Sequence, residues 1–308
     1  MKTPHRAILN PHTRGSRDTR HAFTLIELLV VVAVIAILTA ALLPAISAAR
    51  TQADRTKELA AVRSLAAGYL AYTLDNDQKL PVGQLSFNPF EDTIGRGEWD
   101  VKDGFGNKLI TPLAISRYPF RIGPWLDYQW QGATHINDRA DQLAELRKDL
   151  RADATNYDAA VSAWHYQVSV FPSFGLNSDF LGGNEALFPR YDAPIHIDRT
   201  TDAARASELI AFASAFGVAG ANQTAAGPVV NGYFVVKPPE TEWIGSASTN
   251  PQEFGHVHPR YNDTAVTAML DGRATSLGPA ELADMRLWAD RARRLNDPDW
   301  DPDANSGR

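Results

Sequence analysis

The chain has 308 residues, no cysteine and a formal net charge of −6 at neutral pH. The missing cysteines exclude disulfides and thiolate metal sites. The acidic balance gives no reason to expect a nucleic-acid partner. The length is sufficient for one large domain, or two small ones, with a hydrophobic core.

The N-terminal segment changes abruptly from polar to apolar. Residues 1–22 contain five Lys or Arg residues and one acid, whereas residues 23–46 are apolar apart from Glu27. As a helix, residues 23–46 would be about 36 Å long, enough to cross a bilayer core of about 30 Å. The preceding basic residues favour a cytoplasmic N-terminus. The pattern therefore predicts one membrane-spanning helix over residues 23–46.

Three kinds of N-terminal segment fit this pattern. One is a secretory signal peptide cleaved near the small residues 47–49, and another is a plain membrane anchor. The third is a segment in which Glu27 has a function. A carboxylate near the start of a membrane helix costs a few kcal/mol, so such a residue usually has a partner. Neither of the first two segments needs one.

Residues 21–30, with the sequence HAFTLIELLV, resemble the prepilin signature of type IV pilins and type II secretion pseudopilins. The resemblance implies cleavage between Ala22 and Phe23 by a dedicated aspartic peptidase, followed by N-methylation of Phe23. Ala22 stands where the family usually has glycine. The resemblance also implies that Glu27 pairs with the free amine of a neighbouring subunit, and that Pro44 kinks the helix.

The same resemblance implies a structural subunit rather than an enzyme. Its expected location is the inner membrane, with the C-terminal domain in the periplasm, or in an extracellular filament after assembly. The implied partners are the prepilin peptidase, other pilin or pseudopilin subunits, the inner-membrane assembly platform and membrane lipid. The resemblance does not distinguish a pilus from a secretion pseudopilus.

A different class of protein is the alternative: an anchored or exported binding protein that uses this leader without polymerising. The segment 80–157 is rich in aromatic residues, including Trp99, Trp125 and Trp130. Exposed tryptophans there would favour a carbohydrate or protein ligand, whereas buried ones would indicate ordinary core.

The fold class predicted for the whole chain is α+β and pilin-like: a long N-terminal helix packed on an antiparallel β-sheet domain. Residues 47–78 continue the membrane helix as an amphipathic half, and the globular domain covers residues 79–295. An apolar stripe on the amphipathic half recurs every three or four residues and is expected to pack on the domain. Its members are Leu59, Val62, Ala66, Tyr69 and Thr73. Turn and breaker residues end the helix at residues 75–77.

Shorter elements are predicted within the domain. Residues 138–150 form a short exposed helix, and a final helix of about sixteen residues starts at Gly278-Pro279. Residues 296–308 form an acidic, proline-containing and disordered tail. Alternating or apolar runs predict strands at 165–171, 208–216, 232–237 and 265–270, the last joined by an Asp-Gly turn to a hairpin partner at 273–277.

A second resemblance concerns a branch of pilin-like proteins abundant in planctomycete and verrucomicrobial genomes. It rests on residues 173–178, on residues 208–213 and on His258, Asn262 and the run 269–272. The spacer from His258 to Asp271 is longer than in that branch, so the match is partial. The resemblance implies a fold and little about function.

Candidate chemistry is sparse along the chain. The sequence has no Walker-type phosphate loop, no Gly-x-Ser-x-Gly elbow and no His-Glu-x-x-His motif. His256 and His258 would face the same way on a strand and could ligate a metal with Asp263 or Asp271, although a polar turn is the favoured interpretation. The acidic tail could hold calcium, but it lacks the glycine and the distal glutamate of an EF-hand loop.

Overall fold

The computed structural model describes residues 24–85, 101–109, 111–152, 157–185, 194–219, 227–238 and 250–303, without the side chains of 149–152 and 157–159. The chain divides into two compact units, residues 1–50 and 51–308. The predicted leader, residues 1–22, lies outside the described residues.

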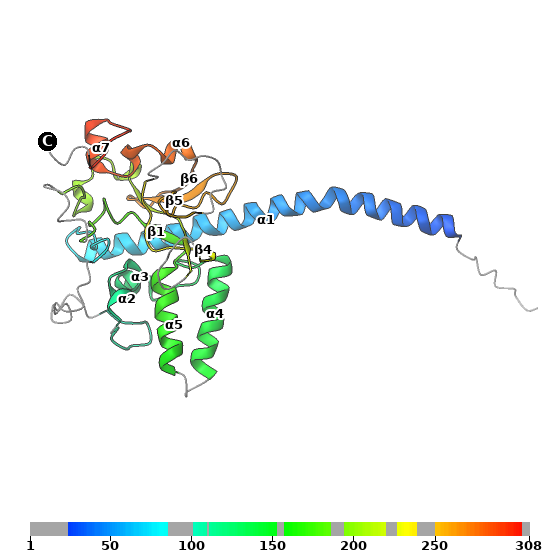
Figure 1. The fold of residues 1–308 in the computed structure, drawn as a ribbon, viewed down its shortest axis with the longest axis horizontal. Coiled ribbons are helices and arrows are strands. Elements are labelled where there is room, and N and C mark those ends of the chain that lie inside the picture. Colours follow the sequence, from blue (N-terminus) through cyan, green and yellow to red (C-terminus); the bar gives the residue numbers. More distant parts are fainter. Residues whose placement is uncertain are drawn as a thin grey trace, which may run out of the picture. The chain divides into compact units, whose positions relative to one another are not determined.

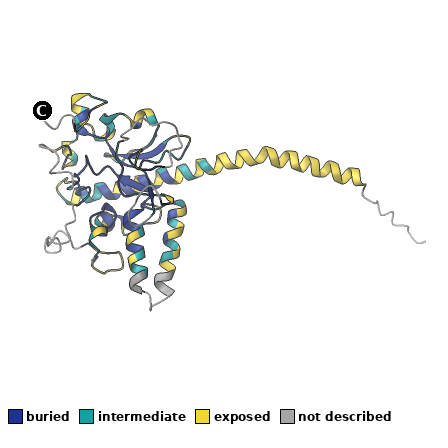
Figure 2. Ribbon diagram, in the orientation of Figure 1, coloured by how far each residue is buried: buried dark blue, intermediate teal, exposed yellow. Residues whose placement is uncertain are grey.

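The longest element is helix α1, Leu25–Asp75. It contains Pro44 without interruption, and every described residue from 24 to 50 is exposed (Figure 2). The valine-rich run of the predicted membrane segment is therefore helical, as it must be if its backbone groups are to be satisfied in lipid. Beyond Asp75 the backbone of Asp77 and Gln78 is left-handed, with φ of 54° and 64°. This turn ends the helix at the predicted place.

The second half of α1 is the central helix of the globular unit. Val62, Leu65, Ala66 and Tyr69 are at most 2% exposed, and the Tyr69 ring lies edge-on to Phe212, with centroids 5.2 Å apart. Leu59 is partly buried and packs against the same core, and Thr73 is buried. The predicted amphipathic stripe is confirmed.

A four-stranded antiparallel sheet packs on this helix. Its order is β1 (Phe174–Leu176), β2 (Ile210–Ser214), β5 (Ala265–Met269) and β6 (Ala274–Leu277). A separate two-stranded sheet pairs β3 (Phe216–Val218) with β4 (Val229–Asn231). The strand predicted at 265–270 and its hairpin partner at 273–277 are confirmed as β5 and β6. The strand predicted at 208–216 is confirmed over its centre as β2, whereas Phe216 begins β3 of the other sheet.

Alternation along the central strands covers both faces of the sheet. In β5, Val266 and Ala268 belong to the core that contains α1, whereas Ala265 and Met269 belong to the core that contains the C-terminal helices. All residues of β2 and β5 are buried. The domain therefore has helix, sheet and C-terminal helices as successive layers, which confirms the α+β class.

A helical insert lies between α1 and β1 in the chain. It comprises α2 (Pro112–Ile115), α3 (Tyr118–Ile122), the 3-10 helix η3 (Gly123–Leu126), α4 (Asn137–Ala152) and α5 (Tyr157–Val170). Helices α4 and α5 lie side by side (Figure 1). Phe120, Trp130, Leu143, Trp164 and Val168 contribute to a core of their own. The predicted helix at 138–150 is confirmed as α4.

Two strand predictions are wrong. Residues 165–170 belong to α5, because Trp164, Val168 and Phe171 are spaced by four and three residues and form one buried helical side. Residues 232–237 follow β4 but form only a single parallel bridge, Val235 with Leu176. Gly232 has a φ of 126°, and a Cβ there would lie 2.5 Å from the Phe171 carbonyl oxygen. This close approach turns the chain away from the two-stranded sheet.

The prediction of one continuous final helix is also wrong. It divides into α6 (Pro279–Leu282), the 3-10 helix η7 (Met285–Leu287) and α7 (Asp290–Leu295). The Asp284 carboxylate caps a new turn by accepting the Arg286 amide at 2.9 Å, and it also accepts the Arg286 guanidinium at 2.7 Å. A short polar side chain thus competes with helix continuation.

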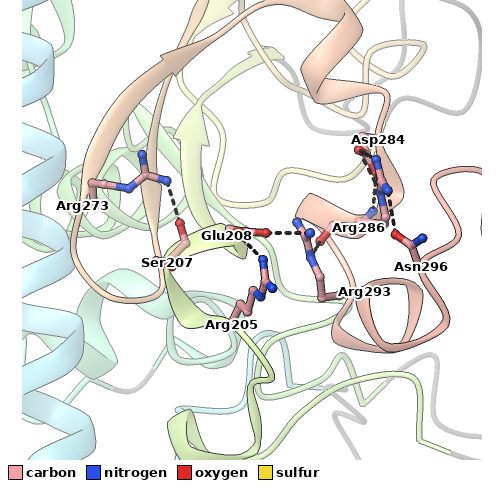
Figure 3. Close-up of polar contacts among 8 residues, drawn as sticks. All are labelled: Arg205, Ser207, Glu208, Arg273, Asp284, Arg286, Arg293 and Asn296. Carbon is pink, nitrogen blue, oxygen red and sulfur yellow. Dashed lines mark hydrogen bonds and ion pairs between the residues drawn. The ribbon is translucent and has the colours of Figure 1, made fainter.

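Polar contacts join the C-terminal helices to the edge of the sheet (Figure 3). The Glu208 carboxylate at the end of the 3-10 helix η6 (Ala206–Glu208) accepts Arg205 at 3.0 Å and Arg293 of α7 at 2.6 Å. Arg273, in the β5–β6 turn, donates to the Ser207 carbonyl oxygen at 2.6 Å. Glu208 and the Ser207 carbonyl oxygen therefore link the segment before β2 to α7 and to the β5–β6 turn.

The start of the acidic tail is packed rather than disordered. The Met285 amide donates to the Pro298 carbonyl oxygen at 2.9 Å. Trp300 is 2% exposed, and its ring centroid lies 6.0 Å from that of Phe180. The prediction of disorder is wrong for residues 296–303, because one large aromatic side chain anchors them. Residues 304–308 lie outside the described part.

Candidate processing and assembly motif

The first turn of α1 closes on itself through Thr24 and Glu27. The Thr24 amide donates to Glu27 Oε2 at 2.8 Å, and the Thr24 hydroxyl donates to the same oxygen at 2.7 Å. In return the Glu27 amide donates to Thr24 Oγ1 at 3.2 Å. This reciprocal pair is a capping box, which satisfies amides that a helix start would leave without partners.

Glu27 therefore has a role within its own helix, which the sequence analysis did not predict. Its negative charge lies at the N-terminal end of the helix, where the aligned peptide dipoles favour an anion. Hydrogen bonds from Thr24 orient the carboxylate but do not neutralise it. In an apolar environment the remaining charge is stabilised by a cation brought close to it.

Thr24 is the residue of this site that the sequence analysis did not identify. The signal was present, because Thr-x-x-Glu before an apolar run is the sequence pattern of a capping box. Among the predicted site residues, Ala22 and Phe23 lie outside the described part of the chain. Pro44 lies inside α1, and the kink predicted there stays a prediction.

Comparison with known proteins identifies this region. Residues 17–43 match the family model of the prokaryotic N-terminal methylation motif. No match was found among curated proteins or among solved structures. Among the described residues, one helix, α1, is long and apolar enough to cross a membrane. The chain thus carries a type IV pilin-like prepilin motif at its N-terminus, and the motif and the apolar helix together fit membrane anchoring.

The tryptophans of the insert differ in exposure. Trp130 is 4% exposed and belongs to the insert core, as does Trp164. Trp125 is half-buried beside α1, and Trp99 lies outside the described residues. Trp130 is therefore ordinary core, and Trp125 is the described tryptophan of this segment that reaches a surface.

The residues proposed as weak metal ligands, His256, His258 and Asp271, each contact a different group of the protein. His256 stacks on Tyr233 with ring centroids 3.9 Å apart, and His258 stacks on Phe216 at 4.7 Å. The Asp271 carboxylate accepts the Arg273 amide at 2.9 Å and so caps the hairpin turn. Within the described ranges, no three His, Asp or Glu side chains form a group that could hold a metal ion.

Buried histidines predict that acid destabilises the domain. His135 is fully buried, and burial followed by the charge of Arg139 lowers its pKa to about 3. Its pKa in the unfolded chain is about 6.5, so protonation favours unfolding and stability is lost as pH falls below about 6.5. Between pH 7 and 4.5 we expect this residue to remove roughly 2–3 kcal/mol from the unfolding free energy.

The variant His135→Gln tests this expectation by urea unfolding at several pH values. Glutamine can still donate to the Gln167 carbonyl oxygen, which the His135 ring reaches at 3.3 Å, but it does not titrate. Its unfolding free energy should fall less steeply with acid, whatever its value at pH 7. An unchanged slope would show that His135 does not drive the acid sensitivity.

Proposed function

We propose that this chain is a prepilin or pseudopilin: a subunit cleaved by a prepilin peptidase, N-methylated and assembled through its N-terminal helix into a type IV pilus or secretion pseudopilus. The methylation motif at residues 17–43 is the observation that carries the proposal. In support, residues 24–50 of α1 are exposed, while residues further along the same helix form the core of a folded domain.

The proposed processing site is the bond between Ala22 and Phe23. Cleavage there would leave Phe23 as the first residue, directly before the capping box of Thr24 and Glu27. The new amine would then lie at the start of α1. In the assembled state, Glu27 of one subunit would pair with this amine on its neighbour, which favours one axial register between helices.

The membrane arrangement belongs to the same proposal. The basic residues before α1 favour an N-terminus in the cytoplasm, with the domain in the periplasm. The partners would be the prepilin peptidase, an inner-membrane assembly platform and other pilin-type subunits. The motif itself indicates a structural protein, not an enzyme.

Mass spectrometry of the mature N-terminus tests the processing step. In membranes from cells with the peptidase, we expect a peptide that begins at N-methylated Phe23, and in cells without it an uncut chain. A mature start near Ala49, or an uncut Met1 with the peptidase present, would contradict the proposal. Either result would favour an exported or anchored binding protein instead.

A further inference from the structure

An open groove runs beside α1 on the surface of the globular unit. It has a volume of about 630 Å³, within the range of about 300–1,000 Å³ that is usual for ligand sites. Its lining residues come from α1 on one side, which we call the floor, and from η3 and the turn after it on the other. Ala67 and Ala71 are small residues of the floor, whereas Gly68 is buried beneath the Leu126 side chain.

One aromatic side chain of the groove is held in a fixed orientation. Trp125 Nε1 donates to Asp75 Oδ2 at 2.8 Å. Its ring packs edge-on against Tyr72, with centroids 4.7 Å apart and planes at 73°. Because both contacts restrict the indole, a ligand that packs on Trp125 would order little additional side chain.

Polar side chains complete the lining. Asp127, Gln129 and Gln131 follow Trp125 along the turn, and Ser64 faces them from α1. The backbone of Asp127 and Tyr128 is left-handed, with φ of 49° and 51°. That conformation is costly for a bulky residue such as Tyr128 and holds this turn in an unusual shape. The groove thus offers one acid, two amides and a hydroxyl next to a restricted indole.

We propose that this groove binds an uncharged carbohydrate chain. A pyranose ring has an apolar C–H face that packs on an indole, and hydroxyls at its edge that pair with carboxylate and amide groups. Ala67 and Ala71, one helical turn apart, present no long side chain to a ring that lies against the helix.

The lining argues against other ligand classes. Among the described residues that line the groove, none is Lys, Arg or His, so an anionic glycan would meet Asp127 without a compensating cation. The lining residues come from helices and a turn, which offer no edge strand for an extended peptide to pair with.

This inference is independent of the proposed assembly function. It concerns the unit formed by residues 51–308 and holds whether or not the chain polymerises. For a filament subunit, the groove would provide contact with a surface or matrix polysaccharide. For a chain that is only anchored, it would be the binding function itself.

The test uses the full chain in lipid nanodiscs, free of sugar-headed detergent. The probes are cellohexaose, maltohexaose and chitohexaose, with hexagalacturonate as the anionic comparison and a pool of random decapeptides as the peptide comparison. Titration calorimetry and tryptophan fluorescence report binding. We expect at least one neutral hexasaccharide to bind, and hexagalacturonate to bind more weakly.

Two matched variants locate the site. Ala67→Gln fills the floor, and Ala60→Gln makes the same change two helical turns earlier at another exposed position of α1 that does not line the groove. Glutamine is a good helix former, so both variants should fold normally. Ala67→Gln should weaken binding by about tenfold or more, and Ala60→Gln should leave it within about twofold.

Three results would overturn the inference. The first is that no neutral hexasaccharide binds at concentrations up to about 10 mM, which corresponds to a binding free energy weaker than about −3 kcal/mol. The second is that Ala67→Gln and Ala60→Gln change binding equally. The third is that the peptides bind more tightly than the sugars. The N-terminus of the mature protein is measured separately, so failure here leaves the processing proposal unaffected.

Discussion

Replacing Glu27 by alanine is expected to abolish incorporation of the chain into filaments while leaving its insertion into the membrane intact. Insertion depends on the length and the apolar character of residues 23–46. The substitution leaves the length unchanged and makes the segment more apolar. Under the proposed function, incorporation would depend on pairing with the amine of the next subunit, because lipid provides little other drive for helices to select one register. Sheared filament yield and membrane fractionation measure the two outcomes. Normal filament yield from this variant would contradict the assembly role.

Glu27→Gln separates the capping role of this residue, which the structure shows, from its proposed pairing with a neighbouring subunit. The glutamine side-chain oxygen can still accept the Thr24 amide and hydroxyl, as Glu27 Oε2 does at 2.8 and 2.7 Å. The charge, however, is lost. If the intersubunit ion pair matters, Glu27→Gln should fail like Glu27→Ala. If only the capping box matters, Glu27→Gln should assemble and Glu27→Ala should not.

Local sequence patterns predict correctly the elements whose conformation is determined by residues close together in the sequence. The breaker residues after Asp75 end α1, the spacing from Leu59 to Thr73 gives its buried side, and the Asp-Gly turn joins β5 to β6. In each case the periodicity or the turn residue is sufficient, because burial of one face and a left-handed backbone are local requirements.

Misassigned elements depend on contacts that sequence spacing does not show. The run 165–171 is short enough to fit a strand or a helix, and packing of Trp164 and Val168 in the insert core decides for α5. The acidic tail looks soluble, yet Trp300 packs near Phe180. The groove could not be predicted either, because α1 and the turn around Trp125 are far apart in the chain.

The prepilin motif is an intermediate case. Glu27 was identified from its cost in a membrane and from the resemblance of residues 21–30, and the family model places the methylation motif over the same region. The capping role of Thr24 needed the geometry of the first turn, although its sequence pattern was visible.

A buried charge ties α1 to the rest of the domain. Glu58 is fully buried, and its Oε1 lies 3.6 Å from Arg260 Nη1. Arg260 also donates to the Ala215 carbonyl oxygen at 2.6 Å. Burial, and then the negative charge of Glu58, raise the pKa of the Tyr261 phenol. The carboxylate therefore lies among groups that depend on its charge, at the contact between the helix and the loop before β5.

Glu58→Ala should lower the unfolding free energy of the domain by about 2–4 kcal/mol, because it leaves the Arg260 guanidinium, whose side chain is 12% exposed, without its counter-ion. Urea unfolding of the full chain in nanodiscs, followed by tryptophan fluorescence, measures the loss. The double variant Glu58→Leu, Arg260→Met should recover part of it, since removing both charges avoids the unpaired one. The recovery should be incomplete because the Ala215 carbonyl oxygen loses a donor.

The adjacent ion pair provides the control. Lys57 lies 3.2 Å from Asp54, but the side chain of Lys57 is 67% exposed. Lys57→Ala should change the unfolding free energy by less than about 1 kcal/mol, because solvent screens an exposed pair. If Glu58→Ala were no more harmful than Lys57→Ala, the Glu58–Arg260 pair would contribute little to how α1 is held. A large difference between the two variants would show that the buried Glu58 carboxylate helps to hold α1 against its domain. In the proposed filament, any force on the domain would pass through this contact to the membrane half of the helix.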